Sequence, residues 1–369
     1  PTRRAPRGAR LIVPHGSGID QVMTESHYAP TVDLNGKSLL ITGGTGSFGT
    51  HFVRTVLARY TPRRLAIFSR DEAKQYVMAQ RFAPPEHSCV RYFIGDVRDR
   101  DRLEMAMRGI EIVIHAAALK HVPTAEYNPF ECIQTNVHGA ENVVHAAIRA
   151  GVEQVIALST DKAASPINLY GASKLAADKI FVAANALSGT APTRFSVVRY
   201  GNVVGSRGSV LPLFQRLHAE GAPDLPITDI RMTRFWITLS QGVDFVLSSL
   251  TMMAGGEIFT PKIPSMKLVD LADCVAPGLK HRIVGIRPGE KLHEVLITED
   301  DARSTVDLGD RYVIEPAFPF WRRGGYDGAT PVPVAEDFGY ASNTNVDWLD
   351  GASLSALLAQ ERESRTSEV

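Results

Sequence analysis

The chain has 369 residues, of which 44% are hydrophobic, and its 40 Lys+Arg balance its 40 Asp+Glu. The zero net charge argues against a global basic surface for nucleic acid, though it is compatible with a local phosphate pocket, and no run approaches the roughly 18 apolar residues of a membrane helix. Three widely spaced cysteines, Cys89, Cys132 and Cys274, predict no disulfide framework or zinc site and favour a reduced, cytoplasmic setting.

The first 34 residues are predicted to form an N-terminal arm. Pro1–Arg10 is rich in arginine and has no apolar segment, so it does not resemble a secretory signal. We interpret the arm as poorly ordered. Two alternatives stay open: an arm that caps another part of the molecule, or sequence upstream of a natural start at Met23.

Short apolar runs alternate with helical stretches such as Phe48–Tyr60 from Lys37 onward. This alternation predicts βαβ units and a parallel sheet buried on both faces, hence an α/β fold with a Rossmann-type, doubly wound sheet. We assign residues 35–204 to a dinucleotide-binding domain. Residues 205–369 are assigned mainly to a smaller α/β substrate-binding lobe, with later returns of the chain. The six predicted strands are Ser38–Thr42, Leu65–Ser69, Val90–Ile94, Ile112–His115, Gln154–Leu158 and Ser196–Arg199.

A glycine-rich turn joins the first predicted strand to the first helix. Gly43, Gly46 and Gly49 have the spacing G-x-x-G-x-x-G. Gly43 permits a tight turn, Gly46 lets the backbone approach a pyrophosphate, and Gly49 lets the helix pack closely on the strand. The helix N-terminus then offers free N–H groups and a positive dipole end to the phosphates. Strand, turn and helix in this order predict dinucleotide binding, against the alternative of an ordinary glycine-rich turn.

The second predicted strand ends in residues that favour NADP over NAD. Ser69 and Arg70 stand where an NAD enzyme usually places a carboxylate for the ribose 2′-hydroxyl, and Lys74 follows one turn later. The alternative is that Arg70 pairs with the acidic residues that follow it. Asp96, after the third strand, is predicted to reach the adenine amine, with a helix N-cap as its plainer role.

Tyr170 and Lys174 lie one turn apart in the pattern Y-x-x-x-K, after the fifth predicted strand. Tyrosine has an ordinary pKa near 10, too high for a base at neutral pH. A neighbouring ammonium and a positively charged nicotinamide favour the phenolate. Tyr170 is therefore expected to exchange the proton of a hydroxyl group that is oxidised.

The fifth strand runs into Thr160-Asp161-Lys162, and here the chain resembles the extended short-chain dehydrogenase/reductase family. Within it, the sequence closely resembles the inverting UDP-N-acetylglucosamine 4,6-dehydratases of the pseudaminic-acid pathway. The likeness extends roughly from Asn35 to Leu349, and many joined motifs make it specific. These motifs are GGTGSFG (43–49), FSRDEAKQ (68–75), FIGDVRD (93–99), HAAALKHVPTAEYNP (115–129), ALSTDKAASPINLYGASK (157–174), VVRYGNVVGSRGSV (197–210), ITDIRMTRFWIT (227–238), IRPGEKLHE (286–294) and EDFGYASN (336–343).

The resemblance implies transient oxidation of the sugar at C4, loss of water across C5 and C6, and return of the hydride to C6. Retaining dehydratases of the family carry Thr-Asp-Glu where this chain has Thr160-Asp161-Lys162. Thr160 would hydrogen-bond the C4 oxygen, Asp161 would protonate the departing C6 hydroxyl, and Lys162 would remove the C5 proton and return one from the other face. As plainer roles, Asp161 would only cap a helix, and Lys162 would be a charged partner of Asp161.

A base must be neutral part of the time, so we expect the pKa of Lys162 to be lowered by burial or by the cations of Lys174 and nicotinamide. The other positions expected to hold the dinucleotide belong to the glycine turn and to the ends of later strands. These are Thr45, Ser47, Phe48, Val97, Ala116, Ala117 and Tyr200.

The resemblance assigns five residues to the UDP-sugar: Asn202, Thr228, Arg234, Arg287 and Glu290. The two arginines suit a diphosphate because guanidinium groups bind it in a bidentate manner. Lys120, after the fourth strand, is expected near the junction of cofactor and sugar. Ordinary ion pairs are the competing interpretation for each. His115 and His121 are expected to be structural, and no metal site is predicted.

The leading hypothesis is therefore a UDP-GlcNAc 4,6-dehydratase that inverts C5. An NADP-dependent UDP-HexNAc epimerase would use the same Tyr170 and Lys174, but it does not need the Asp161–Lys162 pair for chemistry at C5 and C6. A non-catalytic NADP-binding sensor would be expected to have lost Tyr170 or Lys174, and both are present. The resemblance also implies a homo-oligomer, built from dimers and up to a hexamer.

Overall fold

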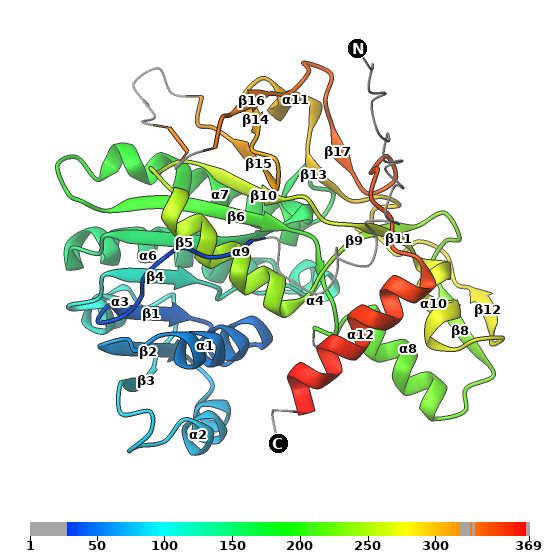
Figure 1. Cartoon of the computed structure of the whole chain (residues 1–369), viewed down its shortest axis with the longest axis horizontal. Helices are drawn as coiled ribbons and strands as arrows, with labels where there is room; N and C mark the ends of the chain where they lie inside the picture. Colours follow the sequence, from blue (N-terminus) through cyan, green and yellow to red (C-terminus); the bar gives the residue numbers. More distant parts are fainter. Residues whose placement is uncertain (1–27, 207, 318–324, 327–328, 367–369) are drawn as a thin grey trace, which may run out of the picture.

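The computed structural model describes residues 28–206, 208–317, 325–326 and 329–366 (Figure 1). A parallel sheet forms the larger domain, with the strand order β3-β2-β1-β4-β5-β6. The order reverses at β1 and β4, and open α/β sheets bind ligands in the crevice at such a point. The predicted Rossmann-type α/β fold is thus confirmed. The strands are β1 (Ser38–Thr42), β2 (Arg64–Ser69), β3 (Val90–Ile94), β4 (Ile112–His115), β5 (Gln154–Thr160) and β6 (Arg194–Tyr200).

Segments from the second half of the chain extend this sheet to ten strands. β10 (Ile258–Pro261) pairs parallel to β6, and three antiparallel strands follow it outward. The chain therefore returns to the first domain within residues 239–261. The outer strands are β15 (Arg311–Ile314), β14 (Thr305–Asp307) and β16 (Val332–Pro333).

Helices cover both faces of the sheet, as right-handed crossovers require. α1 (Ser47–Arg59) packs on α9 (Leu239–Met252) in one layer. In the other layer, α6 (Gly139–Ala150) contacts both α3 (Arg100–Met107) and α7 (Leu169–Leu187). Four short helical segments link strands: α2 (Glu72–Arg81), α4 (Val122–Tyr127), α5 (Pro129–Ile133) and a π-helical turn (Gln134–His138).

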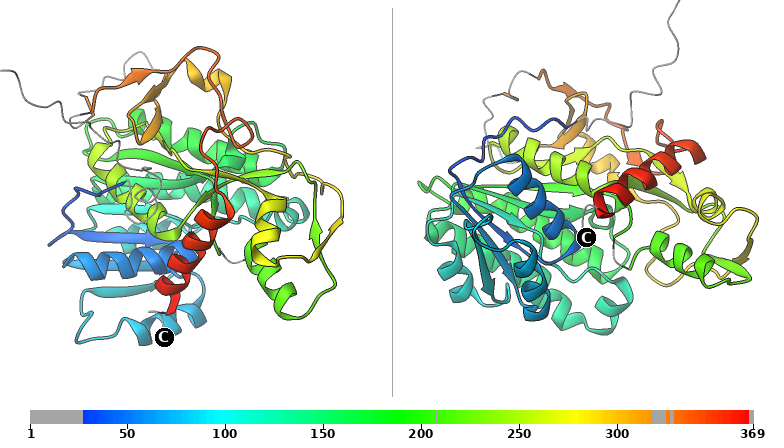
Figure 2. Two further views of the ribbon diagram at one scale, coloured as in Figure 1. Left: turned by 45° about the vertical axis from the view of Figure 1, so that its right-hand side comes forward. Right: turned by 60° about the horizontal axis from the view of Figure 1, so that its bottom comes forward.

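A smaller lobe with its own hydrophobic core projects from one side of the sheet (Figures 1 and 2). Trp236 and Phe214 are buried in this core, and α12 (Gly351–Thr366) packs on α10 (Leu268–Val275). The other elements of the lobe are β7 (Asn202–Val203), α8 (Val210–Ala219), β8 (Asp224–Ile227), β9 (Thr233–Ile237), β11 (Ser265–Lys267) and β12 (Lys280–Ile283). β13 (Val295–Ile297) pairs with β17 (Tyr340–Ala341) in a separate two-stranded sheet, and α11 (Glu299–Ala302) contacts β14.

The end of the predicted arm differs from the expectation. Residues 1–27 lie outside the described residues, but residues 28–34 pack against the domain. Tyr28 is buried with its ring 4.8 Å from that of Phe245, and its hydroxyl donates to the Lys262 carbonyl at 2.8 Å. Leu34 is also buried. Burial of these apolar side chains fixes the segment, so the expectation of a poorly ordered arm is wrong for 28–34. Within the described part of the chain, the helices are too short or too polar to cross a membrane.

Candidate active site

The carboxyl ends of the parallel strands surround a cavity of about 760 Å³. The turn after β1, the last residue of β2 and the residues after β3 and β4 form its dinucleotide half, and the ends of β5 and β6 with α7 form the rest. Side chains from distant parts of the sequence meet here because parallel strands end at one edge of the sheet. The predicted site residues on its wall are Gly43, Thr45, Gly46, Ser47, Phe48, Gly49, Ser69, Arg70, Lys74, Asp96, Val97, Ala116, Ala117, Lys120, Thr160, Lys162, Tyr170, Lys174, Tyr200 and Asn202.

Two glycines of the turn are required by the backbone itself. Gly43 has φ +66, and a Cβ there would lie 2.9 Å from the Cα of Ala117. A Cβ on Gly49 would lie 2.5 Å from the backbone of Gly44. Gly46 is the N-cap of α1 and has no side chain to occupy the first amides of the helix. The helix therefore presents unused N–H groups beside the cavity, which suits a pyrophosphate.

The end of β2 presents hydroxyl and cationic groups rather than a carboxylate. Ser69 Oγ lies 2.7 Å from Thr45 Oγ1. Arg70 has a side chain 57% exposed, and its nearest carboxylate is Asp96 at 3.8 Å. The alternative that Arg70 pairs with the acidic residues after it is thus not observed. Lys74 is held by Asp71, with Nζ 2.6 Å from Oδ2.

Asp96 is occupied by a neighbouring arginine. Its Oδ2 lies 2.8 Å from Arg98 Nη2, and its Oδ1 accepts from the Arg98 amide at 3.0 Å. These contacts lower the pKa of Asp96 against the opposing effect of its partial burial. The cap of α3 is Asp99, so the alternative role of Asp96 as a helix N-cap is wrong.

Tyr170 and Lys174 lie on one face of α7, both buried. Lys174 Nζ donates to the Leu158 carbonyl at 2.7 Å, and burial lowers the pKa of its ammonium. Burial raises the pKa of Tyr170 to about 12, while the Lys162 ammonium and the Thr160 hydroxyl act in the opposite direction. Burial thus favours the phenol, and the phenolate expected beside a positively charged nicotinamide stays a prediction. The cation that favours ionisation is Lys162 rather than Lys174.

Asp161 and Lys162 form an ion pair at the turn after β5. Lys162 Nζ lies 2.9 Å from Asp161 Oδ1, and the Thr160 hydroxyl donates to the same oxygen at 2.9 Å. Asp161 is fully buried, whereas Lys162 retains 25% of its side-chain exposure and lines the cavity. Asn202 also approaches, with Oδ1 3.5 Å from Nζ.

The expected lowering of the Lys162 pKa is wrong for this structure. Burial does lower it, but the charges of Asp161 and Glu294 prevail, so the pKa of Lys162 is raised. Burial and the charge of Glu294 raise the pKa of Asp161, although Lys162 and Thr160 oppose them. Both partners thus hold protons more strongly than usual.

Glu294, which our sequence analysis did not assign, completes the cluster. Its Oε1 lies 3.1 Å from Lys162 Nζ and 3.6 Å from Arg234 Nε. It is the last residue of the motif IRPGEKLHE, but the sequence gives no sign that this carboxylate reaches a turn more than a hundred residues earlier. Only the tertiary fold brings the two together.

Arg234 is held by backbone carbonyl groups. Its Nη1 donates to the carbonyls of Thr233 and Leu292 at 2.7 and 3.2 Å, and its Nη2 donates to that of Lys291 at 3.0 Å. Its Nε faces Glu294. These contacts fix the guanidinium of Arg234 within the protein, and its predicted contact with the UDP-sugar stays a prediction.

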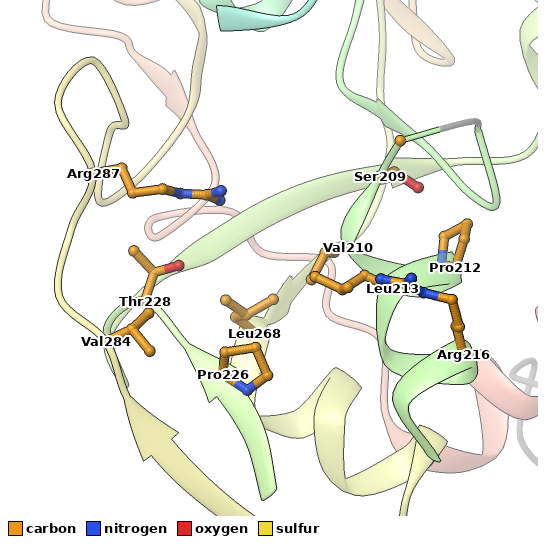
Figure 3. Close-up of a pocket in the computed structure, with 11 residues that line it drawn as sticks. Ser209, Val210, Pro212, Leu213, Arg216, Pro226, Thr228, Leu268, Val284 and Arg287 are labelled. Atoms are coloured by element: carbon orange, nitrogen blue, oxygen red, sulfur yellow. The ribbon is translucent and has the colours of Figure 1, made fainter. Parts of the chain in front are cut away.

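A second cavity of about 500 Å³ adjoins the first, since Gly208 and Ser209 line both. Thr228 and Arg287 lie on one side of it and Arg216 of α8 on the other (Figure 3). Arg287 Nη2 pairs with Glu290 at 2.6 Å, so Glu290 orients this arginine in the structure. Arg216 was not predicted, because a basic residue in a helix is ordinarily a solvated one.

His115 and His121, the histidines singled out from the sequence, occupy different surroundings. His115 is buried, with Nδ1 2.8 Å from Thr42 Oγ1, and burial lowers its pKa to about 3. His121 lies on the wall of the larger cavity. Within the described ranges, no group of three His, Cys, Asp or Glu side chains is placed to hold a metal ion.

Comparison with known proteins matches residues 39–316 to the polysaccharide biosynthesis protein family. The chain is 56% identical over 320 residues to a UDP-N-acetylglucosamine 4,6-dehydratase (inverting) of Campylobacter jejuni, covering 85% of this chain and 95% of that protein. It is also 43% identical over 289 residues to a UDP-glucose 4-epimerase of Rickettsia canadensis, covering 75% of this chain and 82% of the relative.

Solved structures share the fold. The X-ray structure of Pen from Bacillus thuringiensis has a TM-score of 0.81 and 36% identity, covering 90% of this chain and 99% of that one. The dTDP-glucose 4,6-dehydratase DesIV of Streptomyces venezuelae, crystallised with NAD and TYD, has a TM-score of 0.61 and 24% identity, covering 69% of this chain and 86% of that one.

Proposed function

Because the chain belongs to the polysaccharide biosynthesis protein family, we propose that it is a lyase, a UDP-N-acetylglucosamine 4,6-dehydratase that inverts C5. The observation that carries the proposal is the Asp161–Lys162 pair beside Tyr170, at the edge of a dinucleotide-binding sheet. An acid and a base next to the C4 oxidation site are what water loss across C5 and C6 requires. The 56% identity over 95% of the Campylobacter jejuni protein supports the same reaction.

The chain takes a nicotinamide dinucleotide, and we propose NADP as the preferred form. The turn that tolerates no Cβ at Gly43 and the uncapped N-terminus of α1 fit the pyrophosphate. Ser69 and Arg70 fit a 2′-phosphate better than a 2′-hydroxyl. When bound, the dinucleotide accepts hydride from sugar C4 and returns it to C6.

The residues of this chain supply the proton transfers. Tyr170 takes the proton of the C4 hydroxyl, and Thr160 hydrogen-bonds the C4 oxygen. The ketone acidifies the C5 proton, which Lys162 removes while Asp161 protonates the C6 hydroxyl, so that it leaves as water. Lys162 then returns a proton to C5 on the opposite face. After water leaves, Tyr170 holds the proton of the C4 hydroxyl and Asp161 lacks the one it gave to the water. Transfer of one proton from Tyr170 to Asp161 therefore restores the cluster before the next turnover.

Transfer of one proton converts the ion pair of Lys162 and Asp161 into a neutral amine and a carboxylic acid, the forms that the reaction needs. Across the 2.9 Å between Lys162 Nζ and Asp161 Oδ1, the ammonium gives its proton to the carboxylate. The result is a neutral amine that acts as base and a carboxylic acid that acts as acid. The raised pKa of Asp161 favours this transfer, and the raised pKa of Lys162 opposes it. The neutral pair is thus a minor form of the same singly protonated state.

The decisive experiment is mass spectrometry of UDP-GlcNAc after incubation with the purified protein. Loss of one water supports the dehydratase. An unchanged mass with a new sugar in NMR spectra supports the epimerase, the alternative that the Rickettsia canadensis relative represents. An unaltered substrate overturns both.

We further propose that the protein works in the cytoplasm as a homo-oligomer built from dimers. The described cysteines are unpaired, as in a reducing compartment. Tyr127 and Phe130 expose 87% and 83% of their surface near the ends of α4 and α5, a place where a second copy can bury them. Light scattering of the purified chain tests this, and a monomer at micromolar concentration contradicts it.

A further inference from the structure

Glu294 is fixed in place by the C-terminal part of the chain. Its amide donates to Ser342 Oγ at 2.9 Å, and its carbonyl accepts from the Ser342 amide at 2.8 Å. Ser342 Oγ lies 2.7 Å from Thr233 Oγ1, which ties the same segment to β9. The backbone of Glu294 is therefore held from two directions, and its side chain is only 2% exposed.

The side chain of Glu294 makes Lys162 the centre of a buried cluster of charges. Two carboxylates, those of Asp161 and Glu294, share the Lys162 ammonium at 2.9 and 3.1 Å. Arg234, itself locked by carbonyls, faces Glu294 at 3.6 Å. One oxygen of each carboxylate, Oδ2 of Asp161 and Oε2 of Glu294, is buried without a hydrogen-bond partner. Burying a second carboxylate in this way costs free energy of folding, so packing alone does not account for Glu294 at this position.

We propose that Glu294 is a positioning residue for the loss of water: it orients the Lys162 side chain, and its charge sets the pH range over which Asp161 and Lys162 share one proton. This inference rests on the proposed dehydratase function. Glu294 does not line the cavity, so it acts through Lys162 and not on the sugar.

The direction of the charge effect follows from the groups around Lys162. A negative charge at Glu294 makes it harder to remove a proton from either Asp161 or Lys162, and it raises the pKa of both. Burial raises the pKa of Glu294, but the positive charge of Lys162, followed by those of Arg234 and Lys291, prevails and lowers it, so Glu294 stays ionised. Tyr170 is the remaining titratable neighbour, and its pKa responds to Lys162 and Asp161.

Removing the charge at Glu294 should therefore move the whole pH profile of water loss. The pair is active while it carries one proton, between the pKa of Asp161 and that of Lys162. Glu294→Gln keeps the size of the side chain and removes the charge, so both limbs of the kcat/KM profile should move to lower pH by about 1 unit or more. The KM for UDP-GlcNAc should change less than about threefold, since the side chain does not reach the cavity.

Two further variants separate this role from a structural one. Glu294→Asp keeps the charge but draws it back from Lys162, so the limbs should move in the same direction by less, while kcat falls. Glu257→Gln is the matched control, because Glu257 is a fully buried glutamate that binds Ser196 and the Gly255 amide, remote from the cavity. It should lower the melting temperature and leave both limbs in place.

The outcomes are distinct. If both limbs of the kcat/KM profile of Glu294→Gln lie at the same pH as in the wild type and only the maximum value falls, the proposal is overturned. If Glu294→Gln does not fold, Glu294→Asp decides, and an unchanged profile in that variant overturns the proposal as well. A wild-type protein that removes no water from UDP-GlcNAc would instead refute the proposed function, before any variant is compared.

Discussion

Replacing Lys162 by Met tests the assignment of the base. Met keeps the length of the side chain and removes the amine that lies 2.9 Å from Asp161. Tyr170 and Lys174 stay on α7, so oxidation at C4 should still occur. Loss of water should slow by about 10²–10⁴-fold, the usual contribution of a positioned general base.

The same substitution should affect stability, because Lys162 separates two buried carboxylates. Without the ammonium, Asp161 and Glu294 face each other, and Asp161, whose pKa is already raised, takes up a proton. We expect the free energy of unfolding to fall by about 1–3 kcal/mol, the cost of leaving a buried polar group unpaired. Lys162→Arg keeps a cation that cannot act as a base, so it should recover most of this stability and no water loss.

The assay combines single-turnover absorbance of the reduced dinucleotide with mass spectrometry and NMR of the product in D₂O. Wild-type protein should place solvent deuterium at C5 with the inverted configuration. Lys162→Met should form the reduced dinucleotide and then stop. Lys179→Met, at an exposed position of α7, is the control and should behave as wild type. Near-normal water loss in Lys162→Met refutes the assignment, and a retained C5 configuration refutes inversion alone.

Three other predictions concern the dinucleotide and its hydride. Arg70→Ala should weaken NADP⁺ binding by about 1.5–3 kcal/mol, as for a lost hydrogen bond to a charged group, and equal weakening for NAD⁺ in titration calorimetry contradicts the 2′-phosphate assignment. UDP-GlcNAc deuterated at C4 should give product labelled at C6 with no added reductant, and label found in solvent rules out internal return. Gly43→Ala should abolish tight dinucleotide binding, because its Cβ would lie 2.9 Å from Ala117. Gly36→Ala, at φ +69 with nothing within 4 Å, should cost about 1–2 kcal/mol of backbone strain and leave binding intact.

The sheet could be predicted from the sequence because most of its first six strands carry continuous apolar runs, the exception being β3, which contains Arg91 and lies at the edge of the sheet. All five residues of Ser38–Thr42 are buried, as expected for a parallel strand covered on both faces. The outer strands give no such signal. β14 and β16 have only three and two residues, and β16 is exposed, so pairing with distant neighbours defines them. The burial of Tyr28 likewise depends on Phe245, far along the chain.

The same distinction applies to the site. Thr160, Asp161 and Lys162 are consecutive, and Tyr170 lies near the start of the next helix, α7. Their proximity is therefore a local property that can be predicted from the sequence. The protonation of Lys162 is only partly local. Asp161, next to it in sequence, raises the pKa of Lys162 most, and Glu294, more than a hundred residues away in sequence, raises it further. A spacing rule therefore finds the acid and the base but cannot find the distant charge that raises their pKa values further.

The ion pair and the proposed chemistry are reconciled by what a bound sugar does to solvent. Lys162 still exposes 25% of its side chain to the cavity, and water there stabilises the ammonium and, through it, the charged pair with Asp161. A sugar seated on Lys162 displaces that water. Desolvation disfavours both charged forms, lowering the pKa of the lysine and raising that of the acid, and one proton transfer removes both charges at once. We therefore expect the neutral amine and the carboxylic acid to become more populated when a sugar is bound, whereas the ion pair of the structure is the form expected without it.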